Sequence, residues 1–160
     1  MRSKRNFNQS ELSHRQWTAQ RFGLQYAPNA GIDIFDDEFG IELKCRHQPN
    51  HPTFTIHAYQ INDFPEAYPE KELFWGFLVY SLSKTPAKIK GVDITKLVID
   101  RQLWIFEWDW VKQFPVSEAK TGHFVYVKRE FFPPNDEFNV HTGNQGNIYL
   151  PHGCSLEKRL

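Results

Sequence analysis

The side chains best suited to chemistry are two carboxylates and an amine in the stretch 31–46, namely Asp33, Glu42 and Lys44. Apolar and polar residues alternate over this stretch around an acidic segment, which is typical of a β-hairpin with its turn at 37–38. A turn centred there sets Asp33 directly opposite Glu42, and the alternation of side chains puts Glu42 and Lys44 on one face. Carboxylates in opposed positions repel each other. A divalent cation between them removes that repulsion, so the sequence predicts a metal site.

The other elements are predicted from hydrophobic periodicity and from the positions of Gly and Pro. We expect helices over about 10–22 and over 54–62, the second of them stopped by the pair Phe64-Pro65. The almost wholly apolar run 73–82 predicts a central strand that is buried on both faces. The shorter expected segments are strands at 103–106 and 123–128, a helical turn at 108–114 and an irregular tail from about 133.

Length and composition favour one domain, residues 1–160, with a single substantial core. The aromatic share of 16% supplies enough apolar surface for the chain to fold alone. Helices alternating with strands around an apolar centre predict an α/β fold, a central mixed sheet flanked by helices. The sequence has no apolar run long enough to span a bilayer and its start lacks a signal-peptide core, so we expect a cytoplasmic protein. Since the net charge is zero, affinity for nucleic acid must come from a local basic surface.

An Asp on the first strand of a hairpin and Glu-x-Lys on the second, between an early helix and a further helix, resembles the PD-(D/E)xK nuclease superfamily, with its restriction-endonuclease-like fold. Its compact members include type II restriction endonucleases and Holliday-junction resolvases. Ile32 stands where the family name has proline. The resemblance implies that Asp33 and Glu42 hold one or two Mg²⁺ ions and that Lys44 attends the attacking water. The Leu43 carbonyl is a candidate further ligand. The implied reaction is hydrolysis of DNA phosphodiester bonds to leave 5′-phosphate ends.

Further candidates surround these three residues. Glu11 on the first helix could project toward the metal or simply mark the helix start, and Gln60 could lie near the active site or in solvent. The basic start of the chain, which includes Arg15, is expected to follow the DNA backbone. A polar loop after the hairpin carries donors and acceptors suited to phosphates and base edges. The residues expected to contact DNA there are Arg46, His47, Gln48, Asn50, His51 and Thr53.

The sequence leaves several interpretations of the function open. A small type II restriction endonuclease acting as a homodimer is the first expectation, because one site cuts one strand and cutting a duplex needs two. A junction-resolving or repair nuclease is the close alternative, and a non-catalytic DNA-binding domain that has kept the fold is another. A histidine-metal nuclease of the HNH kind is a weaker hypothesis, carried by His47, Asn50, His51 and His57. The Cys and His residues lack the paired spacing of a structural zinc site, and we expect none.

Overall fold

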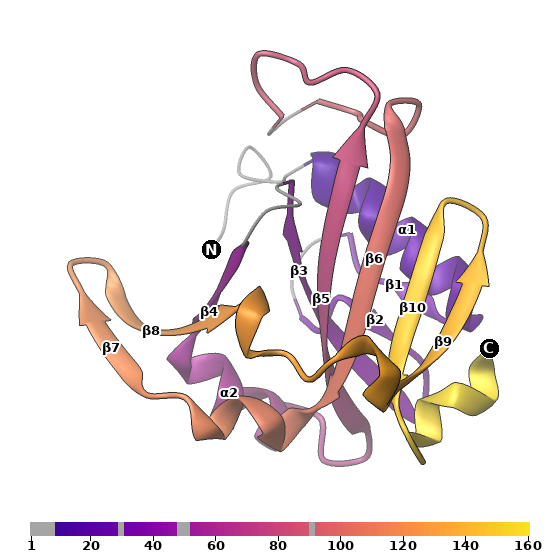
Figure 1. Cartoon of the computed structure of the whole chain (residues 1–160). Coiled ribbons are helices and arrows are strands. Elements are labelled where there is room, and N and C mark those ends of the chain that lie inside the picture. Colours follow the sequence, from indigo (N-terminus) through magenta and orange to yellow (C-terminus); the bar gives the residue numbers. More distant parts are fainter. Residues whose placement is uncertain (1–8, 29–30, 48–51, 90–91) are drawn as a thin grey trace.

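The computed structural model has a central sheet of seven strands in the order β1-β2-β3-β5-β6-β10-β9 (Figure 1). It describes residues 9–28, 31–47, 52–89 and 92–160. The pairs β3–β5 and β6–β10 are parallel and the other pairs are antiparallel, which confirms the predicted α/β fold with a mixed sheet. The strands of this sheet are β1 (Gln25–Tyr26), β2 (Ile34–Phe35), β3 (Phe39–Arg46), β5 (Glu72–Leu82), β6 (Val98–Glu107), β9 (Phe138–Gly143) and β10 (Gly146–Pro151).

The middle strand, β5, is the predicted apolar strand, and it is buried on both faces. Phe74 and Leu78 pack into the hydrophobic cluster on one side of the sheet. Trp75 and Phe77 pack into a second cluster on the other side. Because both faces of β5 are covered, its side chains do not alternate between apolar and polar types.

Helix α1 (Gln9–Phe22) covers one face of the sheet, as predicted for residues 10–22. It ends where Gly23 adopts a φ of 67°, a left-handed conformation that glycine takes at little cost. Buried Arg101 of β6 fixes the helix on the sheet: it donates to Ser13 Oγ at 2.8 Å and to His14 Nδ1 at 3.0 Å. Burial and the Arg101 charge lower the pKa of His14 to about 3, so the ring is neutral. Its Nδ1 is the acceptor of the second bond.

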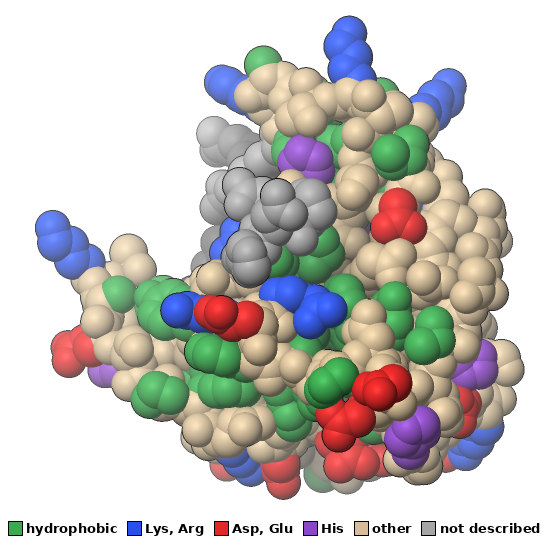
Figure 2. All heavy atoms as spheres, in the orientation of Figure 1, with side chains coloured by type: hydrophobic (Ala, Val, Ile, Leu, Met, Phe, Trp, Pro, Cys, Tyr) green, Lys and Arg blue, Asp and Glu red, His purple; other side chains and the backbone are tan. Residues whose placement is uncertain are grey.

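The opposite face is covered by a second, three-stranded sheet and by helix α2 (Ala58–Ala67). Phe54 and Ile56 of the small sheet pack against Trp75 and Phe77 of the large one. Figure 2 shows the β7–β8 hairpin projecting from the rest of the molecule, with hydrophobic side chains gathered along it. The remaining elements on this side are β4 (Thr53–His57), β7 (Val116–Ala119), β8 (Gly122–Lys128), and the 3-10 helices η2 (Trp108–Gln113) and η3 (Arg129–Phe131).

The prediction of one helix over 54–62 is wrong in its first half, which forms β4, and the helix begins at Ala58. The apolar residues of β4 recur at every second position, a period of two that marks a half-buried strand. Pro65 does not stop α2 either, since it lies inside the helix. A proline has no N–H to donate to the carbonyl four residues earlier. Here the Ile61 carbonyl accepts a bond from Trp108 Nε1 at 2.8 Å instead, so the helix continues.

The prediction of an irregular tail from 133 is also wrong. After the short 3-10 helix η4 (Asn135–Glu137), β9 and β10 form a hairpin in the large sheet, and η5 (Ser155–Arg159) follows. The Gly and Asn residues that suggested a loop belong to the hairpin turn, where Gln145 and Gly146 have φ of 63° and 154°. The predicted strand at 103–106 is part of the longer β6, and the strand at 123–128 and the turn at 108–114 are confirmed. No helix among the described residues is long and apolar enough to cross a membrane.

Candidate active site

The hairpin that carries the candidate site has the predicted register. Ile34 pairs with Ile41 and Phe35 pairs with Gly40, so the turn is centred between residues 37 and 38. Asp33, which directly precedes β2, is therefore in register with Glu42. The Leu43 N–H donates to Asp33 Oδ2 at 2.8 Å, and this bond fixes the first carboxylate against the strand that carries the second.

The side chains of β3 divide between the two faces as predicted. Ile41 and Leu43 pack into the cluster beneath α1, with Cys45 partly buried against the same cluster. Glu42 and Lys44 lie on the opposite face, in register with Trp75 and Phe77 of β5. The strand thus keeps its apolar side chains under the helix and turns its carboxylate and amine toward α2.

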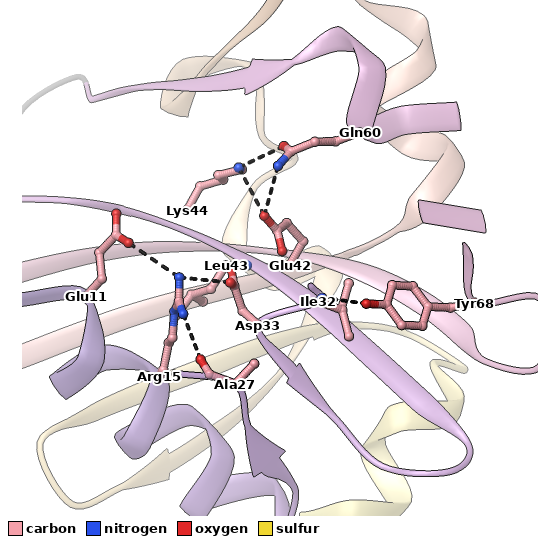
Figure 3. Close-up of polar contacts among 10 residues, drawn as sticks. All are labelled: Glu11, Arg15, Ala27, Ile32, Asp33, Glu42, Leu43, Lys44, Gln60 and Tyr68. Atoms are coloured by element: carbon pink, nitrogen blue, oxygen red, sulfur yellow. Dashed lines mark hydrogen bonds and ion pairs between the residues drawn. The ribbon is translucent and has the colours of Figure 1, made fainter. Parts of the chain in front are cut away.

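Glu42, Lys44 and Gln60 form a closed triangle of hydrogen bonds (Figure 3). Lys44 Nζ donates to Gln60 Oε1 at 2.9 Å and to Glu42 Oε2 at 3.3 Å. Gln60 Nε2 donates to the same Glu42 oxygen at 3.2 Å. Gln60 stands in the first turn of α2, immediately after β4, and is buried. The structure therefore places Gln60 beside Glu42 and Lys44 and not in solvent, the other position that the sequence left open.

Arg15 belongs to the site, and the sequence analysis missed it by assigning it to a surface that follows DNA. Its guanidinium contacts Asp33 Oδ1 at 2.9 Å, donates to the Ala27 carbonyl at 2.7 Å and lies 3.5 Å from Glu11 (Figure 3). Glu11 therefore reaches Asp33 through Arg15, in an i,i+4 pair on α1. A buried carboxylate requires a compensating cation, but the sequence shows only that Arg15 lies one turn after Glu11 and does not pair it with Asp33.

Glu42 is an unusual carboxyl group because it is almost fully buried and only one of its oxygens has partners. Its side chain is 7% exposed, and Oε1 has no hydrogen-bond partner among the residues that the structure describes. Burial and the nearby Asp33 charge raise the pKa of Glu42 to about 8, against the opposing effect of Lys44. The folded protein alone therefore favours a proton on Glu42 at neutral pH. A cation bound beside Glu42 would compensate the charge of its ionised carboxylate in place of that proton.

The donors present fit a small, hard cation. Asp33 and Glu42 supply carboxylate oxygens, and the unpartnered Glu42 Oε1 is available to a cation. The N–H and C=O of one strand residue project to the same edge, so the Leu43 carbonyl faces the edge where its N–H meets Asp33. Mg²⁺ is the cation that takes few protein oxygens and keeps water and phosphate as its other ligands. Within the described part of the chain, no three His, Cys, Asp or Glu side chains cluster closely enough to bind a metal.

The expected DNA-contacting residues have different outcomes. Arg46, at the end of β3, donates to the Thr53 carbonyl at 2.7 Å and lies 3.4 Å from Thr55 Oγ1, which ties β3 to β4. His47 packs its ring against Tyr80, with 5.1 Å between the ring centres. Thr53 is the first residue of β4 rather than part of a loop. The other three candidates lie outside the described residues: Gln48, Asn50 and His51.

Comparison of the chain with protein-family models, curated proteins and solved structures gives no match. The case for a site therefore depends on the geometry of the chain itself. Three different elements, β3, α2 and the segment before β2, bring Glu42, Lys44, Gln60 and Asp33 to one point (Figure 3). Burying charged and polar groups costs stability, and clusters that keep such groups with a shifted pKa are typical of functional sites.

Proposed function

We propose that the protein is a Mg²⁺-dependent endonuclease that hydrolyses DNA phosphodiester bonds. The observation that carries this proposal is the convergence of Asp33 and Glu42 with Lys44, together with the unpartnered buried oxygen of Glu42. The resemblance of this hairpin and its flanking helices to the PD-(D/E)xK superfamily supports the same chemistry. Only two carboxylates meet among the described residues, so we propose one ion per site.

Each residue has a distinct task in this proposal. Asp33, Glu42 and the Leu43 carbonyl would hold the cation, which lowers the pKa of water and neutralises charge that develops on the phosphate. Lys44 is held by Gln60 with its ammonium beside Glu42, where it can orient the attacking water or donate to the scissile phosphate. Gln60 positions Lys44 and Glu42 relative to each other. Arg15 orients Asp33 through the contact with its Oδ1, and Glu11 in turn holds the Arg15 guanidinium.

The biological role of such a nuclease divides into two proposals. A type II restriction endonuclease would act as a homodimer, since each chain has one candidate site and a duplex has two strands. A junction-resolving or repair nuclease would cut branched or interrupted DNA without sequence preference. Both take DNA as substrate and Mg²⁺ as cofactor, and the difference lies in the DNA that each one cuts.

One contact favours a second candidate function, a DNA-binding domain without catalysis. Both oxygens of Asp33 are engaged, Oδ1 by Arg15 and Oδ2 by the Leu43 N–H. A guanidinium on Asp33 neutralises the carboxylate that a cation needs, as expected for a site that has lost its metal. In the nuclease the cation must instead compete with Arg15 for Oδ1.

The test is incubation of the purified protein with supercoiled plasmid and Mg²⁺, with Lys44→Ala and Lys112→Ala as matched variants. Lys112 is a half-exposed lysine paired with Asp109 on η2. We expect wild type and Lys112→Ala to cut, and Lys44→Ala to bind DNA with at least a hundredfold lower cleavage rate. Discrete fragments indicate a restriction enzyme, and a smear indicates cutting without sequence preference. DNA binding without cleavage of plasmid or of branched DNA by the wild type would favour the non-catalytic domain.

A further inference from the structure

The outward face of the three-stranded sheet carries a row of aromatic rings. In the register of β4 with β8, His57 pairs with Phe124, and Thr55 pairs with Tyr126. Paired residues point to the same face of a sheet. The intervening residues of both strands, among them Ile56, are buried against the large sheet. The side chains of the row therefore lie on the face of the small sheet turned away from the large sheet, where Phe124 is buried beneath its neighbouring rings.

Each ring of this row packs against the next one. The centre of the His57 ring lies 5.5 Å from that of Tyr59 and 4.8 Å from that of Phe124, and Phe124 lies 6.2 Å from Tyr126. The two outermost rings are open to solvent, with Tyr59 59% exposed and Tyr126 40% exposed. We call these four residues the ring platform. Exposed tyrosines at both ends of a packed row offer flat apolar faces to a ligand.

The charge on this face is suited to an anion. Lys128 pairs with Thr53 at one end of the sheet, and Arg46 of β3 reaches across to Thr53 and Thr55. By register, no acidic residue lies on the outward face of the three described strands. The nearest acid at the Lys128 end is Glu130, whose carboxylate lies 3.9 Å from the Lys128 ammonium.

The ring platform lies beside the elements that carry the candidate active site, α2 and β3. At one end, Tyr59 immediately precedes Gln60, which holds Lys44 and Glu42. At the other, Arg46 lies two residues after Lys44 on β3. A nucleic acid strand that has a phosphate at Lys44 would pass Arg46 and the edge of β4 to bring its neighbouring nucleotides over the rings.

We infer that the ring platform binds unpaired bases, so that the substrate is DNA with a single-stranded segment next to the scissile phosphate. This inference rests on the proposed nuclease function and names its substrate class. Bases that are stacked in a duplex have no free face to offer, whereas unpaired bases stack on exposed aromatic rings while cations follow the backbone. Flaps, forks and junctions have such segments. The platform thus favours a structure-specific nuclease over a restriction enzyme.

The test compares binding of three fluorescein-labelled DNAs in EDTA: a single strand, its blunt duplex, and a fork with the same duplex and two unpaired arms. The variants are Tyr59→Ala and Tyr126→Ala, with Tyr59→Phe and Tyr126→Phe as controls that keep the rings. Val140→Ala, at a half-exposed position on β9, controls for loss of exposed apolar surface. We expect each alanine variant to weaken binding of the fork and the single strand about tenfold, with duplex binding within about twofold of wild type. The phenylalanine variants and Val140→Ala should bind as wild type does.

Three results would overturn the inference: no preference of the wild type for unpaired DNA, equal binding by the alanine variants, or dissociation of a wild-type dimer by those substitutions. The last would make the platform an interface between two copies of the chain. Cleavage of the same fork in Mg²⁺ separates this inference from the proposed function. If the wild type binds the fork through its tyrosines but does not cut it, the inference about the ring platform stands and the proposed nuclease function is wrong.

Discussion

In the proposed nuclease, Glu42 would bind either a proton or a cation, and this competition would control how the site responds to pH. Its pKa of about 8 means that a cation must displace a proton at neutral pH. We expect the cleavage rate to rise with pH up to about 8 at low Mg²⁺, and a tenfold higher Mg²⁺ concentration to move the midpoint down by about one pH unit. Initial rates measured across pH at two Mg²⁺ concentrations check this. A pH midpoint that does not change with the Mg²⁺ concentration would contradict competition between the proton and the cation at Glu42.

The same carboxyl group reduces the stability of the fold as pH rises. The pKa of folded Glu42 lies above its ordinary value of 4.5, so between pH 4.5 and about 8 the folded state holds a proton that the unfolded state has lost. The stability that it contributes is complete below pH 4.5 and is lost as pH rises to about 8. We expect Glu42→Gln, which stays neutral, to be more stable than wild type by roughly 2–4 kcal/mol at pH 8.

Urea unfolding in EDTA at pH 4.5 and pH 8 measures this difference. The two proteins should have nearly equal stability at pH 4.5, and Mg²⁺ at pH 8 should stabilise the wild type alone. An advantage for Glu42→Gln of the same size at both pH values would mean that uncharged contacts, not ionisation, are responsible.

At the scale of single residues, the site could be predicted wherever the signal was local. Asp33, Glu42 and Lys44 follow from the period of a strand and the position of one turn, and the register agrees. Arg15 does not follow from any local pattern. Its contact with Asp33 depends on how α1 packs beside the hairpin, and a sequence shows only that Arg15 lies on a helix with Glu11.

Helix α2 depends on a contact from another element, because Pro65 leaves the Ile61 carbonyl without an intrahelical donor. The Trp108 indole fills that role from η2. We expect Trp108→Phe to lower the free energy of unfolding by about 1–3 kcal/mol, and by about 1 kcal/mol less when Pro65→Ala is also present. The backbone N–H that this second substitution introduces would then donate to the Ile61 carbonyl in the indole's place.

Chemical denaturation of the four proteins in this double-mutant cycle gives the coupling between the two positions. The loss of ring volume is the same in both backgrounds and cancels. Equal costs of Trp108→Phe with and without Pro65 would show that the indole serves only as a packing group.

The errors at the scale of elements have the same cause. Glycines and asparagines of a hairpin turn look like a loop until their strands are seen to pair, and β10 pairs with β6, which lies far from it in the sequence. Likewise, the pair Phe64-Pro65 is typical of a helix end. The donor that compensates for the missing proline N–H at the Ile61 carbonyl is Trp108, which lies on a different element. By contrast, β5 was predicted correctly, since burial on both faces leaves a continuous apolar run.

Over the whole molecule, the candidate site lies where the two sheets and α1 meet. The large sheet supplies Glu42 and Lys44, helix α2 directly after β4 supplies Gln60, and α1 supplies Arg15. The ring platform extends from this joint along the small sheet. A chain built in this way has one candidate site among its described residues, so cutting both strands of a DNA requires two chains or two encounters.

Mixing wild type with Lys44→Ala distinguishes these two cases. The substrate is a supercoiled plasmid with an extruded cruciform, which presents unpaired and branched DNA until a nick relaxes it. If two chains cut together, wild type alone should give linear DNA, and an equal mixture should give mainly nicked circles, because about half of the dimers then have one active chain. If single chains act alone, wild type itself should give nicked circles, since the cruciform is lost after the first cut. Agarose gels of the early products check this, and nicked circles from undiluted wild type would contradict a cutting dimer.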